Sequence, residues 1–217
     1  MLARIASLVV GYLFGIIQTA YIYGKMNGID IREHGSGNAG TTNALRVLGK
    51  KAGVIVFAGD FLKCFVTIYL VQWLFKSTAS DILPLIGLYG AAGCILGHNF
   101  PVQLNFRGGK GIACTAGLLA ALDIRIGVIA LISFLLVVII TRYVSLGSMI
   151  VVTEFTVFLI VFGQMGLYHM TQAALIEMYV LGGLLTAMAI YRHRANIVRL
   201  VKGTENKIFS KKQEEKN

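Results

Sequence analysis

A glycine-rich stretch with two cations, "FRGGKGIACTAG", lies near the middle of this otherwise apolar chain. Glycines let backbone N–H groups approach an anion, and the apolar run from Ile112 predicts a helix whose N-terminus favours negative charge. The stretch is not a Walker motif, because Gly111 rather than Ser or Thr follows Lys110. A tight turn with snorkelling cations is the alternative interpretation. The predicted phosphate contacts are Arg107, Gly108, Gly109, Lys110 and Gly111.

A second polar segment, "HGSGNAGTTNALR", combines hydroxyl and amide side chains with glycines and ends on a short helical turn carrying Arg46. Such a loop predicts a site for a phosphate or a polyol, with the Arg46 guanidinium as a bidentate donor. A turn that Thr41 or Thr42 caps as a helix begins is the alternative. Ser36 is the candidate catalytic residue of this segment, as a donor to a developing oxyanion. The expected substrate contacts are Asn38, Thr42, Asn43 and Arg46.

The third polar segment, "YRHRANIVRLVKGTEN", places Arg192, Asn196 and Arg199 on one face of a helix, with His193 beside Asn196. Arg192 and Arg199 are predicted phosphate contacts. His193 is a candidate proton acceptor and Asn196 a candidate oxyanion donor, so both are predicted to be catalytic. A basic helix that contacts anionic lipid headgroups is the alternative.

The composition identifies the kind of molecule that carries these segments. Of 217 residues, 56% are hydrophobic and 14% are charged, whereas soluble domains carry roughly 25% charged residues. The chain is therefore predicted to be an integral membrane protein, with one domain over residues 1–205 and a basic cytoplasmic tail over 206–217. Basic cytoplasmic loops explain the net charge of +10 without nucleic acid. The three cysteines lack a CxxC pair and are expected to be free thiols.

Spanning helices need about 20 mostly apolar residues. Six apolar stretches are long enough, and a seventh, residues 112–122, is short for an upright crossing. Most lysines and arginines lie in residues 24–52, 101–111 and 192–217, which should share the cytoplasmic side. This places the N-terminus outside and the C-terminus in the cytoplasm, which requires an odd number of crossings. The expected fold is an all-α, seven-helix transmembrane bundle with three polar loops on the cytoplasmic face. The six clear spans are residues 2–23, 53–75, 82–100, 124–141, 146–167 and 173–191.

Asp60, Lys63 and Glu154 are charged residues well inside predicted spans. Asp60 and Lys63 share a helix face at i, i+3. Each would cost roughly 2.5–3.5 kcal/mol at the bilayer centre if it faced lipid. We expect the two to form a structural ion pair inside the bundle. Glu154 is a similar anomaly with no partner nearby in the sequence.

The three motifs together resemble the bacterial acyl-phosphate:glycerol-3-phosphate acyltransferase family, PlsY. The resemblance covers residues 36–205 and rests on "SGNAGTTNALR", "GHNFPVQLNFRGGKGIA" and "RHRANIVRLVKGTE", in that order on one predicted face. The Asp-x-x-Lys of the family's membrane helix is Asp60 and Lys63 here. Cys114 stands where the family usually has Thr, and Cys64 where it has Gly. Neither change removes a predicted phosphate contact.

The resemblance implies transfer of a fatty acyl group from acyl phosphate to glycerol 3-phosphate. The products would be 1-acyl-glycerol 3-phosphate (lysophosphatidate) and phosphate, in the first acylation step of phospholipid synthesis. It further implies a multi-pass protein of the bacterial plasma membrane that uses no cofactor, metal, coenzyme A or acyl carrier protein. Either His193 or the substrate's own phosphate would take the hydroxyl proton, and the resemblance favours the substrate. A thioester on Cys114 is a less favoured route.

Two other classes of protein would carry some of the same features. An organic-phosphate transporter could couple ions through Asp60, Lys63 and Glu154. Against it, all three motifs fall on one predicted side and the sequence shows no inverted repeat. A lipid-headgroup binding protein without catalysis would not need the cluster of Ser36, Asn38 and Arg46.

Overall fold

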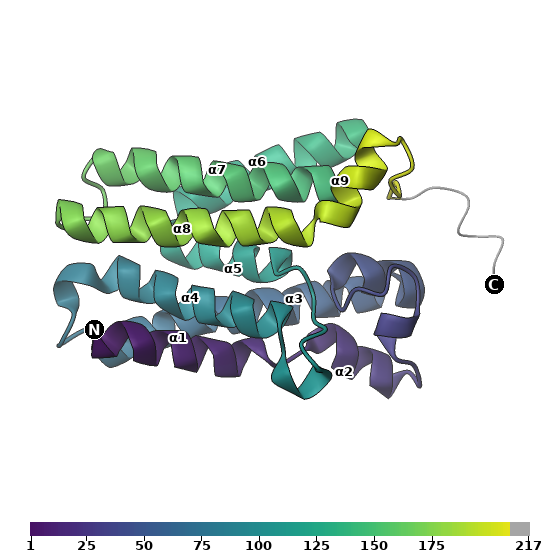
Figure 1. The fold of residues 1–217 in the computed structure, drawn as a ribbon, viewed down its shortest axis with the longest axis horizontal. Coiled ribbons are helices and arrows are strands. Elements are labelled where there is room, and N and C mark those ends of the chain that lie inside the picture. The colour runs from purple at the N-terminus through teal and green to yellow at the C-terminus, as the bar shows by residue number, and fades with distance from the viewer. Residues whose placement is uncertain (209–217) are drawn as a thin grey trace.

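The structure, a computed structural model, describes residues 1–208 and is built from helices (Figure 1). Short 3₁₀ helices lie at Ile31–Glu33, Ser80–Ile82 and Val102–Leu104. The α-helices are α1 (Leu2–Gly15), α2 (Thr19–Met26), α3 (Thr41–Phe75), α4 (Leu83–Asn99), α5 (Ile112–Leu122), α6 (Ile124–Thr141), α7 (Val144–Gln164), α8 (Gln172–Arg192) and α9 (Arg194–Val201).

The long helices run roughly antiparallel and form a bundle in which α5 lies at the centre (Figure 1). Among the described residues, 6 helical segments are long and apolar enough to cross a membrane. The short helix α5 has the predicted bounds, and its 11 residues span about 16 Å. It packs against α3, α4 and α6. The three polar segments meet at one end of the bundle, where α2, α9 and the loops beside them lie (Figure 1).

The first predicted span is broken rather than continuous. Helix α1 ends at Gly15 and α2 begins at Thr19. Side chains from other helices satisfy the freed backbone carbonyls: Lys63 Nζ donates to Gly15 O and Ile17 O at 3.3 and 2.7 Å. Gln18 Nε2 donates to Gly15 O at 3.2 Å. The prediction of one uninterrupted helix over residues 2–23 is therefore wrong, because tertiary partners replace helical hydrogen bonds at the break.

Helix α3 consists of two parts that meet at Gly49. This glycine has φ 85° and ψ −176°, a backbone conformation that costs other residues considerable strain. The first part, residues 41–48, is the expected short helix that carries Arg46. The second part continues to Phe75 as the membrane-spanning portion. The kink allows the short helix to leave the bundle axis and to line the polar end.

Candidate active site

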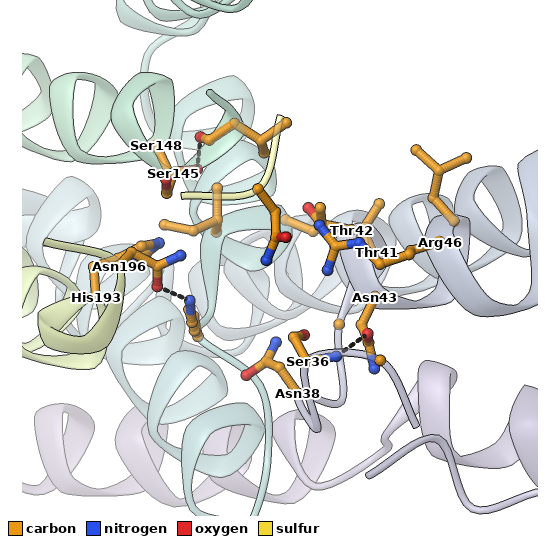
Figure 2. A pocket seen from close by; sticks show the side chains of 18 of the residues that line it. Ser36, Asn38, Thr41, Thr42, Asn43, Arg46, Ser145, Ser148, His193 and Asn196 are labelled. Carbon is orange, nitrogen blue, oxygen red and sulfur yellow. Dashed lines mark hydrogen bonds between the residues drawn. The ribbon is translucent and has the colours of Figure 1, made fainter. Parts of the chain in front are cut away.

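The three polar segments line one cavity of about 1320 Å³. Figure 2 shows side chains from separate parts of the chain facing this space: Ser36 and Asn38 from a loop, Thr42 and Arg46 from α3, and His193 and Asn196 from the α8–α9 region. Ionisable side chains of the wall are mainly cationic. They are Arg32, Arg46, Lys50, Arg107, Lys110, Arg192, Arg199 and Lys207, against the acids Asp60 and Glu205.

The first segment is held in shape by Asn43, which is 1% exposed. Its Oδ1 accepts from the Ser36 backbone N–H at 2.8 Å. Its Nδ2 donates to Ile31 O and His34 O, each at 3.0 Å. All three hydrogen bonds hold the loop in its conformation. Asn43, which was expected to contact the substrate, therefore shapes the site through its amide group. Gly40 and not a threonine is the N-cap of α3, and the helix N-terminus opens into the cavity at Thr41 and Thr42.

The glycine loop lies directly on the end of α4. The Gly109 N–H donates to His98 O at 3.1 Å. A Cβ on Gly108 would lie 2.0 Å from His98 O, and a Cβ on Gly109 would lie 2.0 Å from His98 Nε2. The two glycines are therefore required by close contact with His98. Gly111, at φ 81°, is the N-cap of α5, so a second helix N-terminus faces the same cavity.

Lys110 and the third segment are joined through Asn196 and Glu205. Lys110 Nζ donates to Asn196 Oδ1. Asn196 Nδ2 donates to Glu205 Oε1 at 2.8 Å, and Arg199 Nε donates to Glu205 Oε2 at 2.7 Å. Ser145 Oγ, from the first turn of α7, donates to the same carboxylate at 3.1 Å. Glu205 thus fixes two predicted site residues and connects them to α7.

Arg192 contacts the backbone of the glycine loop. Its Nη2 donates to Gly108 O at 3.1 Å and to Gly109 O at 2.6 Å. The guanidinium also lies over the Phe100 ring, with 5.3 Å between Cζ and the ring centroid, which is a cation–π contact. Arg192 therefore supports the loop backbone, and a direct phosphate contact by this residue stays a prediction. Arg107 is exposed at the rim.

His193 is buried between α8 and α9, at 2% exposure. Its Nδ1 lies 2.8 Å from Ala189 O, and a carbonyl can only accept, so Nδ1 carries the proton and Nε2 is left as an acceptor. Burial lowers the pKa of His193 to about 4, and the Lys110 charge adds to this effect. The imidazole is accordingly neutral at pH 7.

Lys110 is also shifted by its surroundings. Burial lowers the pKa of Lys110 to about 8, and neighbouring guanidinium groups act in the same direction, while Glu205 opposes them. The ammonium is mostly protonated at pH 7 and loses its charge as the pH rises through 8. An arriving phosphate dianion would stabilise the charged form.

Residues that were not predicted as site residues complete the wall. Ser145 and Ser148 of α7 lie beside the cavity (Figure 2), and Glu205 and His98 line it as well. The two serines are three residues apart on one helix face and follow Arg142. This polar pattern at the start of an apolar helix could have identified them from the sequence. The predicted tail lies mostly outside the described residues, but Asn206, Lys207 and Ile208 line the cavity.

Apolar side chains from α3 and α6 form another part of the same wall. They are Leu45, Phe57, Phe134 and Val138. Helix α6 has many exposed apolar side chains, including Ile139 at 73%. Cys114 is 0% exposed, so its thiol has no open path to a substrate, which disfavours the thioester route. The cavity thus combines a cationic, hydrogen-bonding floor with an apolar wall.

Asp60 lines this cavity and pairs with Lys63, whose Nζ lies 2.8 Å from Asp60 Oδ1. Asp60, His98 and Cys114 offer ligand atoms that lie within 4.8 Å of one another. The Lys63 ammonium is also 2.9 Å from His98 Nδ1, so a lysine supplies the positive charge between these groups. Glu154 lies apart from the cluster, in a shallow groove on α7, and its Oε2 has no hydrogen-bond partner among the described residues.

Comparison with known proteins places this architecture in a family. A family profile described as "Glycerol-3-phosphate acyltransferase" matches residues 5–203. A glycerol-3-phosphate acyltransferase of Clostridioides difficile (strain 630) is 44% identical over 206 residues, covering 94% of this chain and 95% of that protein. One from Thermoanaerobacter sp. (strain X514) is 40% identical, covering 94% of each.

Solved structures agree with the sequence relatives. The crystal structure of PlsY (YgiH), an integral membrane glycerol 3-phosphate acyltransferase, in its glycerol 3-phosphate form superimposes with a TM-score of 0.81 at 33% identity. The match covers 94% of this chain and 95% of that one. Its lysophosphatidic acid form gives a TM-score of 0.79. With apolar helices of spanning length, this chain is a multi-pass membrane protein, and it belongs to the PlsY family of glycerol-3-phosphate acyltransferases.

Proposed function

We propose that this chain transfers a fatty acyl group from acyl phosphate to glycerol 3-phosphate, giving lysophosphatidate and phosphate. The observation that carries the proposal is the cavity itself. Its floor gathers a glycine loop, two helix N-termini and several cations, all of which suit anionic phosphates. Its apolar side, between α3 and α6, suits a fatty chain that stays in the bilayer. A reaction between an acyl phosphate and a water-soluble phosphate ester needs both surfaces in one place.

The chemistry needs no nucleophile from the protein, because acyl phosphate is already activated. The glycerol C1 oxygen attacks the acyl carbon, a tetrahedral oxyanion forms, and the acyl–phosphate C–O bond breaks to release phosphate. The hydroxyl proton passes to a base during this step. A pKa of about 4 makes His193 a weak base. We therefore assign proton uptake to a substrate phosphate, with the His193 Nε2 atom orienting the hydroxyl as a hydrogen-bond acceptor.

The cations and hydrogen-bond donors of the cavity fall into two proposed roles. Arg46, Lys110 and Arg199 bind the two phosphates, with Asn38, Thr42 and the loop glycines supplying shorter-range donors. Ser36 and Asn196 stabilise the oxyanion. Asn43, Arg192 and Glu205 hold these groups in place through the bonds described above.

The proposed orientation follows from the distribution of charge. The basic polar segments meet at one end of the bundle (Figure 1), and basic loops face the cytoplasm. With α5 as the seventh crossing, the N-terminus lies outside and the active site opens to the cytoplasm of a bacterial cell, at the plasma membrane. The substrate glycerol 3-phosphate is cytoplasmic in this arrangement.

A transport or binding role is separated from catalysis by one experiment. Purified protein in sealed liposomes receives palmitoyl phosphate in the membrane and radiolabelled glycerol 3-phosphate outside. We expect the label to appear in lysophosphatidate. Label that crosses into the lumen unchanged, without lipid product, would instead identify a transporter, and binding without either outcome would identify a headgroup-binding protein.

A further inference from the structure

A buried polar cluster lies beneath the glycine loop and has no role in the mechanism above. It consists of Asp60 and Lys63 on α3 and His98 at the end of α4, exposed by 1%, 7% and 3% respectively. These groups lie inside a membrane bundle, where ionisable residues are expensive to retain. The position of His98 against the loop suggests what the cluster does.

The protonation of His98 follows from its neighbours. The Lys63 ammonium lies 2.9 Å from His98 Nδ1, 2.8 Å from Asp60 Oδ1 and 2.7 Å from Ile17 O. A fourth contact joins it to Gly15 O at 3.3 Å. An ammonium has three N–H donors and no acceptor, so it can accept in none of these contacts. His98 Nδ1 must therefore accept. In the neutral ring the proton is then on Nε2, the atom that faces Gly109.

The His98 ring and backbone both fix the loop. The His98 carbonyl accepts from the Gly109 N–H at 3.1 Å, and Nε2 lies 2.0 Å from where a Gly109 Cβ would be. Arg192 donates separately to the carbonyls of Gly108 and Gly109. The loop that carries Lys110 is thus held by contacts with both His98 and Arg192. A rotated or differently protonated His98 ring would change the surface on which the loop rests.

We infer that Asp60, Lys63 and His98 form a positioning unit for the glycine loop. Asp60 orients the Lys63 ammonium, and the ammonium holds His98 as the neutral Nε2–H tautomer. The imidazole then sets the position of the Gly108–Lys110 backbone, and hence of the phosphate-binding groups. His98 is a positioning residue in this role, and the pair on α3 acts through it. The inference depends on the proposed function only for its kinetic readout.

The tautomer is tested with His98 and its neighbours unchanged, independently of activity. Nitrogen NMR of protein labelled with ¹⁵N-histidine distinguishes protonated from unprotonated ring nitrogens at the 4 histidines. His34 and His169 are removed by substitution with Asn to simplify assignment. We expect His98 and His193 to be neutral at pH 7 and to have opposite tautomers, with the proton on Nε2 in His98 and on Nδ1 in His193. A doubly protonated His98, or a proton on its Nδ1, would overturn the inference.

The kinetic test uses a double-mutant cycle. The variant Asp60→Asn/Lys63→Met removes both charges together and so leaves neither buried alone. His98→Asn keeps an acceptor near Lys63 but shortens the side chain that contacts Gly109. Each is expected to lower kcat/KM for glycerol 3-phosphate by about tenfold or more, and the combined variant to lose little beyond either. Additive losses, or wild-type kinetics in His98→Asn, would refute the coupling.

A matched control separates positioning from general destabilisation. Arg4 and Glu177 form another partly buried ion pair, at 2.6 Å between α1 and α8. Arg4→Met/Glu177→Gln should lower the melting temperature without changing kcat/KM more than about twofold. If this control impairs turnover as strongly as the Asp60/Lys63 variant at equal stability loss, the unit has no special role. If the wild-type protein makes no lysophosphatidate, the proposed function fails, and the NMR result still decides the tautomer.

Discussion

The affinity for glycerol 3-phosphate should fall at alkaline pH because of Lys110. Burial and neighbouring guanidinium groups lower the pKa of this lysine to about 8. A lowered pKa means that the free enzyme loses the ammonium as the pH rises through that value. The substrate phosphate is already a dianion above pH 7, so its own ionisation contributes little between pH 8 and 9.5. Only the enzyme titrates in this window.

The expected magnitude follows from the fraction of protonated lysine. If the substrate binds only the charged form, the apparent KM rises by a factor of one plus the ratio of neutral to charged lysine. With a pKa of about 8, that factor is about 1.1 at pH 7 and about 11 at pH 9. The KM should therefore increase about tenfold across these two pH units, and kcat at saturating substrate should change less.

Steady-state assays from pH 6.5 to 9.5, with palmitoyl phosphate saturating, measure this profile. Lys110→Arg is the matched variant, because a guanidinium stays charged throughout. It should have lower activity but a flat KM up to pH 9.5. A flat wild-type profile would refute the assignment of Lys110 to phosphate, as would a variant whose KM rises in the same way.

Three further predictions address the loop, the guanidinium and the topology. Gly109→Ala would place a Cβ 2.0 Å from His98 Nε2, so the loop must shift, and we expect about a hundredfold loss of kcat/KM in the lysophosphatidate assay; near-normal turnover would contradict this contact. Arg46→Lys keeps the charge but loses the planar guanidinium fork, so kcat/KM should fall roughly ten- to hundredfold. The control Lys76→Ala, at the exposed far end of the same helix, should leave kcat/KM unchanged. Equal effects of the two substitutions would show that Arg46 does not belong to the site. A maleimide that cannot cross the membrane should label Thr204→Cys only from the cytoplasm and Ser80→Cys only from outside, and labelling from one common side would exclude the proposed topology.

Hydropathy predicted most of the fold because long apolar runs in a membrane protein have few alternatives to helix. Helix α5 has the bounds expected for residues 112–122, and α6 those expected for 124–141. The break between α1 and α2 could not be predicted in this way. Ile16 and Ile17 are as apolar as their neighbours, and the break is stabilised by Lys63, which is distant in the sequence.

The site was predictable in its residue types and less so in its internal contacts. Residue spacing and the family resemblance identified all three polar segments as parts of the site, and the structure places them around one cavity. What each side chain contacts depends on tertiary structure. The Asn43 amide holds a loop, Arg192 donates to loop carbonyls, and Ser145 reaches Glu205 from another helix. No local pattern specifies a contact such as that between Ser145 and Glu205, which are 60 residues apart.

The choice of acyl donor tests the central claim most directly. Purified protein is incubated with glycerol 3-phosphate and either palmitoyl phosphate or palmitoyl-CoA, without added metal, nucleotide or acyl carrier protein, and lysophosphatidate is measured by mass spectrometry. The cavity combines a phosphate-binding floor with an apolar wall, so we expect product from palmitoyl phosphate with release of one inorganic phosphate per acyl group transferred, and none from palmitoyl-CoA. Efficient transfer from the thioester, with no product from the acyl phosphate, would contradict the proposed reaction.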